Sequence, residues 1–454
     1  MAYAEKHNMQ MIENRFVERT AELDVYYAKK AFIPTITMGT SVNVGIGRTI
    51  DPFTNQFTNE PVISNSWNVN ASMPVFQGFS LHANLKKAKM SQQSSQLTAK
   101  QASRDLTIQI ANAYLQILFN KELLELNSQQ LMLSKAQVDR TIRLIEAGRL
   151  PKSEVYEMQV QLTDAEVLVA AGKNNLMISK LQLKQLLGLP AEKDISISTP
   201  TIEEPDSSSL EIYFMELMDY SEIQPENQLN TLAVRQAEID LQQAKRAYLP
   251  TLSISYGVGT GFSSQTRTFV TEEGEVRTVV SPIGFVSPDG GQTRGDIVYQ
   301  ESFVGPDIVP VDVSLPDQFR ENLNQSTNIN ISIPFLSAAT SLKQGLRNSR
   351  IALERARMKA KNEENSTKQS LFQKLTEAQA AFQTYQINQK KQKIQKRAFQ
   401  EAESKYEKGQ INSFEYTTAK NSLWKSENEL LRSKYEAVLK IKILHFFMGE
   451  GFSF

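Results

Sequence analysis

LDVYYAKKAFIPTIT, at residues 23–37, recurs 216 positions later as IDLQQAKRAYLPTLS, at residues 239–253. Two more segments recur in the same order: NVNASMPVF (68–76) returns as NINISIPFL (328–336), and EAGRLPKSE (146–154) returns as EKGQINSFE (407–415). A repeat of this kind fixes the architecture before any single residue does. Because the unit is half of the chain, the sequence indicates one structural unit built twice rather than a solenoid.

The duplication also sets the expected domain organisation. We expect a first structural repeat over residues 1–190, truncated at its start, a linker over 191–225 and a second repeat over 226–454. The two repeats are expected to form one domain, with strands and helices from both halves interleaved around a common axis.

Composition excludes several classes of protein. Lys plus Arg number 50 and Asp plus Glu number 50, so no basic field favours a nucleic-acid partner. The absence of cysteine removes disulfides, thiolate metal sites and cysteine nucleophiles. His7, His82 and His445 are the only histidines and lie far apart in sequence. We therefore expect no metal, no cofactor and no enzyme activity, since no histidine–carboxylate pair, phosphate-cradling glycine loop or nucleophile elbow is present.

Four stretches of sequence alternate between apolar and small polar residues. A period of two predicts a strand with one apolar and one polar face. The apolar faces comprise Ile36, Met38, Val42 and Val44; Trp67, Val69 and Met73; Leu252, Ile254 and Tyr256; and Ile329, Ile331 and Ile333. None of the four stretches carries a charge, and each has about 9–11 residues, the length of a tilted strand that crosses a bilayer. Apolar outside and small-polar inside is typical of a transmembrane barrel with a wet lumen.

The number of strands decides between two arrangements. A soluble sheet of two hairpins packed on helices is the alternative to a membrane barrel. Four strands cannot close a barrel, because lipid tolerates no open edge and the smallest barrels have about eight strands. A membrane barrel would therefore be assembled from the strands of several copies of the chain. Pro34, Pro74, Pro250 and Pro334 are expected at strand ends, where no ladder hydrogen bond is lost.

Long helices are expected between the strands. Residues 80–146 contain neither proline nor glycine, and a second long helix is predicted over 338–407. A helix of 70 residues is about 105 Å long. The return helices, 151–187 and 413–447, cover about half of that length, so a helix over 1–31 should continue the first of them end to end. A plain antiparallel coiled-coil rod would explain the helices but not the uncharged strands.

Two connecting segments have a distinctive composition. The second hairpin connection, about 260–325, has ten Asp or Glu against four Arg and no Lys. Its glycine and proline content predicts a loop without regular structure. A flap over a pore is the alternative interpretation of this segment. The linker between the repeats is rich in Ser, Pro, Asp and Glu, with a short helical patch predicted over 210–219.

The order helix, strand, strand, long helix, glycine turn, helix, repeated twice, resembles the TolC family of outer-membrane efflux proteins across essentially the whole chain. The matching residues are AKKAFIPTI and AKRAYLPTL, MPVFQGF and IPFLSAA, the tips EAGRLPKSEV and YEKGQINSFEY, and LKQLLGLP at the end of the first repeat. GRTIDPFTN is similar to the loop of Bacteroidota members. The departures are the absence of a leader segment and the outsized second loop.

The resemblance implies a fold that is mainly α with β: a homotrimer with a 12-stranded β-barrel in the outer membrane and a long α-helical barrel, a coiled-coil tunnel, through the periplasm of a Gram-negative cell. The linker between repeats would be equatorial. The protein would be a channel, a passive exit duct of a tripartite efflux or type I secretion system. Its partners would be outer-membrane lipid, a periplasmic adaptor (membrane fusion) protein and an inner-membrane pump.

The same resemblance implies site residues at the tips of the helical hairpins. Gly148, Arg149 and Leu150 with Gly409, Gln410 and Ile411 match the adaptor-docking tips. A tight turn there would expose a small glycine notch and a hydrophobic knob. Glu401, Lys405 and Glu407 are candidates for a gate that closes the tunnel at its tip, and a solvated helix face is the alternative for them.

Two classes of function remain to be separated. The first is a passive duct for pumped compounds or secreted proteins, in which the small polar strand faces line the lumen. The second is a coiled-coil scaffold without a channel. Dependence of the protein on detergent separates the two.

Overall fold

The computed structural model describes residues 1–200, 204–205, 210, 220–221, 223–287, 295–334 and 336–452. The helices are α1 (Ala2–His7), α2 (Met9–Lys30), α3 (Ser80–Glu146), α4 (Glu154–Leu187), α6 (Pro225–Arg246), α7 (Leu315–Glu321), α8 (Leu336–Glu407) and α9 (Ser413–Phe447). The strands are β1 (Thr35–Gly45), β2 (Thr49–Ile50), β3 (Phe57–Thr58), β4 (Val62–Gln77), β5 (Thr251–Ser263), β6 (Arg267–Thr271), β7 (Arg277–Val286), β8 (Asp296–Val304), β9 (Ile308–Asp312) and β10 (Asn324–Ser332). The helical patch predicted over 210–219 lies outside the described residues except for Leu210.

The chain divides into two compact units, and each draws on both sequence repeats. The helical unit comprises Met1–Lys29, His82–Lys245 and Thr340–Phe454. The strand unit comprises Lys30–Leu81 and Arg246–Ala339. The repeat boundaries expected from the sequence stay a prediction, since the units cut across the repeats.

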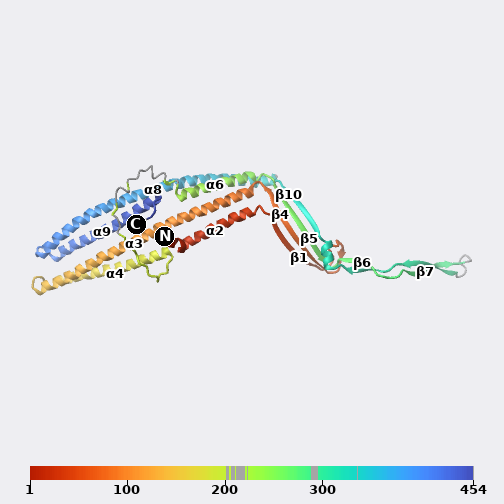
Figure 1. The fold of residues 1–454 in the computed structure, drawn as a ribbon, viewed down its shortest axis with the longest axis horizontal. Helices are drawn as coiled ribbons and strands as arrows, with labels where there is room; N and C mark the ends of the chain where they lie inside the picture. The colour runs from red at the N-terminus through yellow and green to blue at the C-terminus, as the bar shows by residue number, and fades with distance from the viewer. Residues whose placement is uncertain are drawn as a thin grey trace. The chain divides into compact units, whose positions relative to one another are not determined.

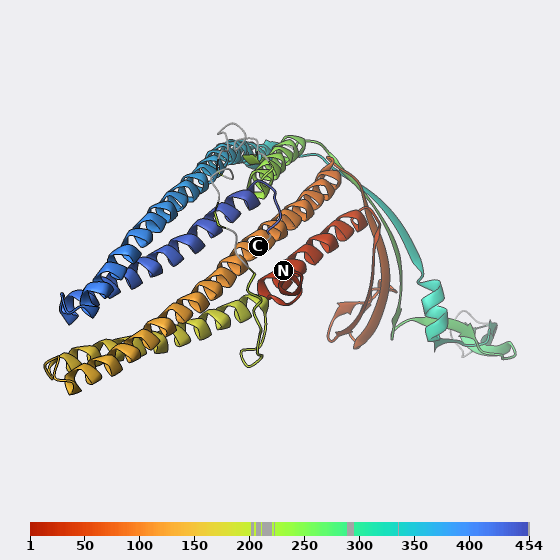
Figure 2. The same ribbon diagram turned by 60° about the vertical axis from the view of Figure 1, so that its left-hand side comes forward.

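The helical unit contains two long hairpins, α3 with α4 and α8 with α9, which lie side by side in both views (Figures 1 and 2). At 67 and 72 residues, α3 and α8 run for about 100 Å each. Their apolar contacts form small separate clusters rather than one core. Leu371, Leu375 and Leu444 join α8 to α9, and Leu115 and Val438 join α3 to α9. Narrow seams of this kind agree with the modest apolar content of the chain.

The first half-length helix differs from the expected single helix over 1–31, because the chain breaks at Asn8. There the backbone is extended, and the Asn8 carboxamide oxygen accepts from the amide nitrogens of Gln10 (2.9 Å) and Met11 (3.4 Å). An Asn in this position caps the new helix α2. The Asn8 side-chain nitrogen donates to the carbonyl oxygen of Leu186 at 2.9 Å. The end of α4 and the start of α2 therefore meet beside α3, which confirms the end-to-end arrangement.

The second half repeats the junction with other side chains. Gln224, just before α6, donates to the carbonyl oxygen of Phe447 at the end of α9, at 3.0 Å. The Arg104 guanidinium of α3 pairs with Glu226 and lies 4.7 Å from the ring centre of Phe447. Burial and this arginine act on Glu226 in opposite directions, and its pKa is lowered on balance. The duplicated architecture is thus held by different chemistry in each copy.

The strand unit is built on one antiparallel sheet in the order β1-β4-β5-β10. Each hairpin comes from one repeat, and the β4–β5 pairing joins the two. All four strands are free of charged residues. In this sheet β1 and β10 each have one neighbour, so both edges are open.

Two expectations about the strands are wrong. The longest strand, β4, has 16 residues rather than about 9–11, and Pro74 lies inside it. A register shift between Pro74 and Phe76 accommodates the proline, because a bulge leaves one residue out of the ladder.

The segment 260–325 is also not a loop without regular structure. It contains β6 paired with β9, β7 paired with β8, and the helix α7. Runs of Val, Ile, Phe and Thr in this segment favour strands, and they outweigh its glycine and proline content.

Candidate functional site

The two hairpin tips share one backbone geometry. Gly148 and Gly409 have φ angles of 70° and 71°, in the left-handed region that favours glycine. Gly148 N donates to Ile145 O and Arg149 N to Leu144 O, both at 2.9 Å. The corresponding bonds of Gly409 and Gln410 are 3.0 and 2.9 Å. This is the double bond of a Schellman motif, which satisfies the last carbonyl groups of α3 and α8.

Open space surrounds the tip glycines. A Cβ atom added at Gly148 or Gly409 would meet no heavy atom within 4 Å. Arg149 and Gln410 are exposed, whereas Leu150 and Ile411 are half-buried and do not form the protruding knobs expected from the sequence. The most exposed large hydrophobic side chains near the tips are instead Tyr156 and Phe414, in the first turns of the return helices α4 and α9. Their position after the glycine turn was the only sequence signal for them.

The three candidate gate residues divide into two groups. Glu401 and Lys405 pair with each other at 2.8 Å within one face of α8, and this lysine lowers the pKa of Glu401. That pair joins no other element. Glu407 instead reaches Arg140 of α3 at 3.4 Å and so crosses between the hairpins. Arg140 carried no sequence signal, because it precedes Glu407 by 267 positions.

A group of polar side chains joins the two hairpins above the tips, and we call it the inter-hairpin polar layer. Its members are Ser134, Gln137, Arg140 and Thr141 of α3, Glu154 and Glu157 of α4, Tyr406 and Glu407 of α8, and Ser413, Tyr416 and Lys420 of α9. The buried Ser413 hydroxyl donates to Glu154 and lies 3.3 Å from a carboxylate oxygen of Glu157. These bonds run from tip to tip.

The layer contains one buried cation, Lys420, a residue that is only 8% exposed. Its ammonium group donates to the Ser134 hydroxyl at 3.0 Å and has no carboxylate within salt-bridge distance among the described residues. Burial lowers the pKa of Lys420 to about 8, because the charged form loses hydration.

The layer is also incompletely hydrogen-bonded. Tyr406 stacks on Tyr416 with ring centres 4.7 Å apart, and burial raises the pKa of Tyr416 to about 12. The hydroxyls of Tyr406 and Thr141 and the amide nitrogen of Gln137 are buried and face one another, but their mutual hydrogen bonds lack good geometry. Poorly aligned hydrogen bonds between buried polar groups recover only part of the free energy of their desolvation, so this contact between hairpins is weaker than an apolar seam of the same size.

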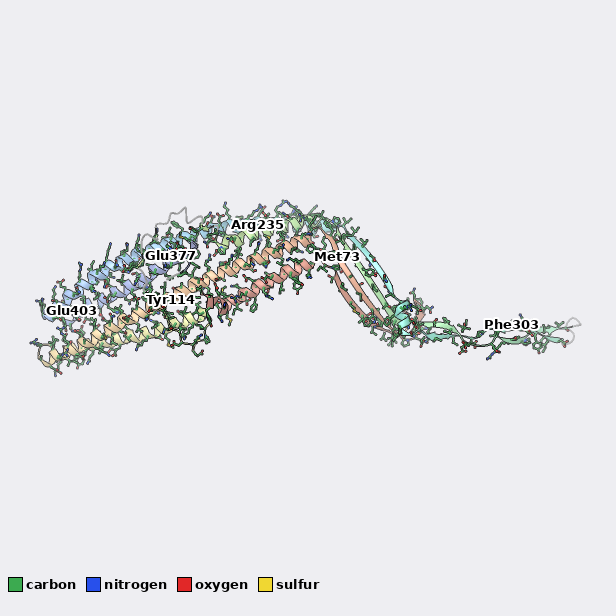
Figure 3. The ribbon with its side chains drawn as sticks, in the orientation of Figure 1. Met73, Tyr114, Arg235, Phe303, Glu377 and Glu403 are labelled. Carbon is green, nitrogen blue, oxygen red and sulfur yellow. The ribbon has the colours of Figure 1, made fainter. Side chains whose placement is uncertain are left out.

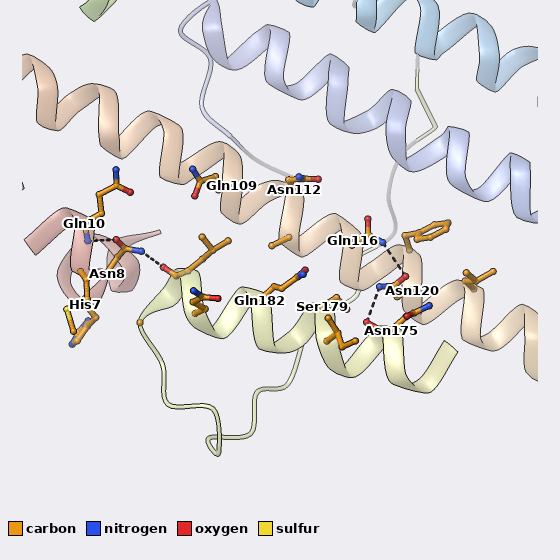
Figure 4. A pocket seen from close by; sticks show the side chains of 18 residues that line it. His7, Asn8, Gln10, Gln109, Asn112, Gln116, Asn120, Asn175, Ser179 and Gln182 are labelled. Atoms are coloured by element: carbon orange, nitrogen blue, oxygen red, sulfur yellow. Dashed lines mark hydrogen bonds between the residues drawn. The ribbon is translucent and has the colours of Figure 1, made fainter. Parts of the chain in front are cut away.

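A hollow with a volume of about 1080 Å³ lies at the first helix junction of the helical unit (Figure 4). Carboxamides dominate its walls, among them Asn8, Gln109, Asn120 and Gln182. Several are used internally: Gln116 donates to Asn120 at 3.2 Å, and Asn120 donates to the carbonyl oxygen of Asn175 at 3.3 Å. The first bond orients Asn120 within α3 and the second holds α3 against α4, so we assign the hollow to the helix junction.

The candidate membrane strands share one face of the sheet. Along the ladder, Met38 lies opposite Val69 and Val69 opposite Val258. The pairs Met73–Ile254 and Ile254–Ile329 continue the same face, as do Leu252 and Ile331. Met73 is labelled in Figure 3. Ile333 stands one residue beyond the end of β10. The opposite face carries Asn, Ser, Thr and Gly, so the predicted two-faced character extends across all four strands.

Two classes of feature are not found in the part of the chain that the structure describes. No helix there has the length and apolarity to cross a membrane. No three histidine or acidic side chains there gather as metal ligands would.

Comparison with known proteins gives one consistent result. Residues 2–189 match the family model described as "Outer membrane efflux protein". The outer membrane protein TolC of Salmonella enteritidis is 20% identical over 210 residues, which cover 46% of this chain and 43% of that protein. The matched stretch is thus less than half of the relative.

Solved structures match over nearly the whole chain. A membrane protein from Pseudomonas aeruginosa has a TM-score of 0.74 at 14% identity, covering 99% of this chain and 91% of the other. The Campylobacter jejuni CmeC outer membrane channel has a TM-score of 0.73 at 14% identity, covering 99% and 85%. At this level of identity the likeness shows the fold.

Proposed function

We propose that this chain, whose residues 2–189 match the outer membrane efflux protein family and which has the TolC-like fold, is a passive exit duct assembled from three copies. The duct would conduct pumped solutes across the outer membrane without a catalytic step. The observation that carries the proposal is the uncharged four-stranded sheet, with one continuous apolar face, one small polar face and two open edges.

The open edges supply the reason for assembly. Unpaired backbone amide and carbonyl groups are costly in lipid, so β1 and β10 must each find a strand. Pairing β10 of one copy with β1 of the next closes a ring without exposing an edge. Three copies give 12 strands, with the apolar face toward lipid and the Asn and Ser face toward water.

The tips support the finer proposal of a tripartite efflux or type I secretion system. Gly148, Arg149 and Gly409, Gln410 form two exposed turns of identical backbone with no atoms crowding the glycines. Such notches fit the docking of a periplasmic adaptor, which an inner-membrane pump would engage in turn. Tyr156 and Phe414 add exposed aromatic contact area beside the notches.

The inter-hairpin polar layer supports a gate at the same end. The contact between α3 and α8 by Arg140 and Glu407 is exposed and therefore weak, and the poorly aligned hydroxyls of Tyr406 and Thr141 gain better partners when water enters. Separation of α3 from α8 at this exposed pair thus costs little free energy. Of the predicted gate residues, Glu407 lies in this layer, while Glu401 and Lys405 pair along α8.

Single-channel conductance in a planar bilayer tests the duct. The trimer purified in detergent should conduct ions, and neighbouring substitutions in β4 provide matched variants. Val69→Lys places a charge on the lipid face and should cost about 2–4 kcal/mol per copy near the bilayer midplane, with loss of trimer. Asn70→Lys places the same charge on the water face and should leave the trimer intact while shifting ion selectivity toward anions.

Two results would contradict the duct. The first is a chain that stays monodisperse and monomeric without detergent, as a coiled-coil scaffold would. The second is equal tolerance of lysine at positions 69 and 70, because a soluble sheet has no lipid face to disturb.

A further inference from the structure

The second hairpin connection contains a two-stranded ribbon that the duct does not require. β7 (10 residues) pairs with β8 (9 residues), and β6 pairs with β9 nearer the sheet. Figure 1 shows β6 and β7 running on beyond the four-stranded sheet as a thin ribbon. The first hairpin connection is far shorter, with only the two-residue strands β2 and β3. The ribbon is therefore a feature of one repeat alone.

The register sorts the ribbon into two unlike faces. Phe303 lies opposite Thr278, Tyr299 opposite Pro282, and Glu301 opposite Val280. With Ile297 these residues form what we call the aromatic face, on which Glu301 is the one charge. The other face carries Arg277, Ser281, Asp296, Gln300 and Ser302 between its valines.

The aromatic face is open in the single chain. Phe303, labelled in Figure 3, is 74% exposed, and Tyr299 and Ile297 are 55% and 44% exposed. A two-stranded hairpin is marginally stable by itself in water, since it buries little apolar surface. A ribbon with this composition is stabilised when its aromatic face is covered.

The base of the ribbon is fixed to the sheet. Within the strand unit, α7 packs on β5: Gln318 accepts from Ser263 N at 2.9 Å, and Thr260 donates to Phe319 O at 2.6 Å. Asn322 donates to Gly261 O at 2.8 Å. These contacts hold the start of the ribbon at the end of β5 that leads into β6.

We propose that the aromatic faces of the ribbons from neighbouring copies of this chain pack against one another and form a cap over one mouth of the barrel. This inference rests on the proposed trimer, because pairing of β10 with β1 carries three identical ribbon bases to one rim. Twelve strands about 4.8 Å apart and tilted by roughly 40° enclose a barrel roughly 24 Å across. A ten-residue strand spans about 33 Å, so ribbons rooted on that rim can reach each other.

A second copy fits the aromatic face better than an unrelated partner. The ribbon bases are held at the same rim by the barrel interface, so contact between copies is intramolecular within the trimer and pays no further cost of encounter. Opposite each other, the Tyr299 and Phe303 side chains would bury apolar area while the polar face remains in water. The face presents no cluster of charges that would select a charged ligand.

Disulfide cross-linking tests the cap directly, because the chain contains no cysteine of its own. Tyr299→Cys and Phe303→Cys place single thiols on the aromatic face. Gln300→Cys and Ser302→Cys are matched controls on the same strand and the opposite face. After oxidation of the purified trimer in detergent, the first two variants should run as covalent dimers on non-reducing denaturing gels, and the controls as monomers.

The oligomeric state of each variant is measured in parallel by light scattering. Trimers in which Tyr299→Cys and Phe303→Cys stay uncrosslinked, or crosslink no more than the controls, would overturn the cap and leave the duct intact. A protein that is not trimeric would overturn both proposals. Exclusive crosslinking through Gln300→Cys would show that the polar faces meet and would also reject the cap.

Discussion

The two helical hairpins have the same tip backbone and different side chains. Gly148 and Gly409 differ by one degree in φ and end their helices with the same pair of hydrogen bonds. The return helices begin differently, since the Asn412 side chain caps α9 by accepting from Glu415 N at 2.8 Å, whereas Ser153 makes no such bond at α4.

The side chains around the tips have diverged into complementary sets. The second hairpin presents Lys420, Ser413 and Glu407 to the first. Their partners in the first hairpin are Ser134, Glu154 and Arg140, in the same order. Duplication therefore preserved the turn, which depends on backbone conformation, and made a contact between unlike partners from side chains that were free to change.

The largest effect is expected at Lys420. Its pKa of about 8 lies below the ordinary value of 10.5, so the folded state disfavours the proton that the unfolded state holds. The free energy of unfolding should accordingly rise between pH 8 and about 10.5 and carry the full penalty below pH 8. Lys420→Met removes the buried charge and should stabilise the protein at pH 7 by about 3 kcal/mol.

Thermal melts of the wild type and Lys420→Met as a function of pH measure this effect. The exposed Lys425→Met on the same helix is the control and should change little. A variant that is less stable than wild type at pH 7 would show that the bond to Ser134 outweighs the burial of charge.

The next largest effect concerns the tip glycines. Gly148→Ala and Gly409→Ala should each destabilise the fold by about 1–2 kcal/mol, because the left-handed backbone is unfavourable for L-residues. Asn tolerates this backbone, so Gly→Asn variants should be nearly neutral in stability. Gly345→Ala, inside α8 and with open space around it, should have the opposite sign.

The Gly→Asn variants also separate the role of the glycines in the turn from their role in adaptor docking. If an adaptor covers the notches, Gly148→Asn and Gly409→Asn should reduce efflux in cells while leaving melting temperatures near wild type. Normal efflux in both variants would argue against docking at the glycines.

Ser413 should have a smaller effect. Ser413→Ala removes the donor to Glu154 and Glu157 and should cost about 1 kcal/mol by urea denaturation. Ser422→Ala is the control, since the Ser422 hydroxyl bonds only to Thr418 O of its own helix. Equal costs for both substitutions would mean that the tip-to-tip bonds contribute nothing.

The smallest energetic effect is expected for Arg140 and Glu407, which are 38% and 56% exposed in their side chains. A double-mutant cycle with Arg140→Ala and Glu407→Ala should give a coupling free energy of about 0.2–1 kcal/mol that falls with added salt. Conductance of the Glu407→Ala trimer should exceed that of the wild type, while Glu401→Ala, which breaks only a pair within α8, should match the wild type.

Much of the fold followed from local sequence patterns. The period of two in the strands and the proline- and glycine-free runs of the helices are local signals, and the duplicated motifs fixed their order. The break at Asn8 was missed because a single asparagine within a helical pattern is a weak signal. The glycine and proline content of 260–325 predicts a loop, whereas the ribbon depends on pairing between its strand-forming runs, which composition alone does not reveal.

The sequence predicts only some of the residues of the candidate site. Gly148 and Gly409 could be found because a left-handed turn demands glycine. Arg140, Ser134 and the Ser413–Glu154 bond could not, since they pair residues more than 250 positions apart. The packing of the tip turns decides which apolar side chains are exposed there. It exposes Tyr156 and Phe414 and half-buries Leu150 and Ile411.

The sequence by itself determined the duplication, the helix and strand types, the uncharged two-faced strands and the glycine turns, because each rests on backbone preference or on a short-range period. Only the tertiary structure decided which charges meet, that Lys420 lies buried against Ser134, and that Phe303 and Tyr299 share one face of a ribbon. Those facts arise from register and packing between segments far apart in the chain, and no local pattern carries them.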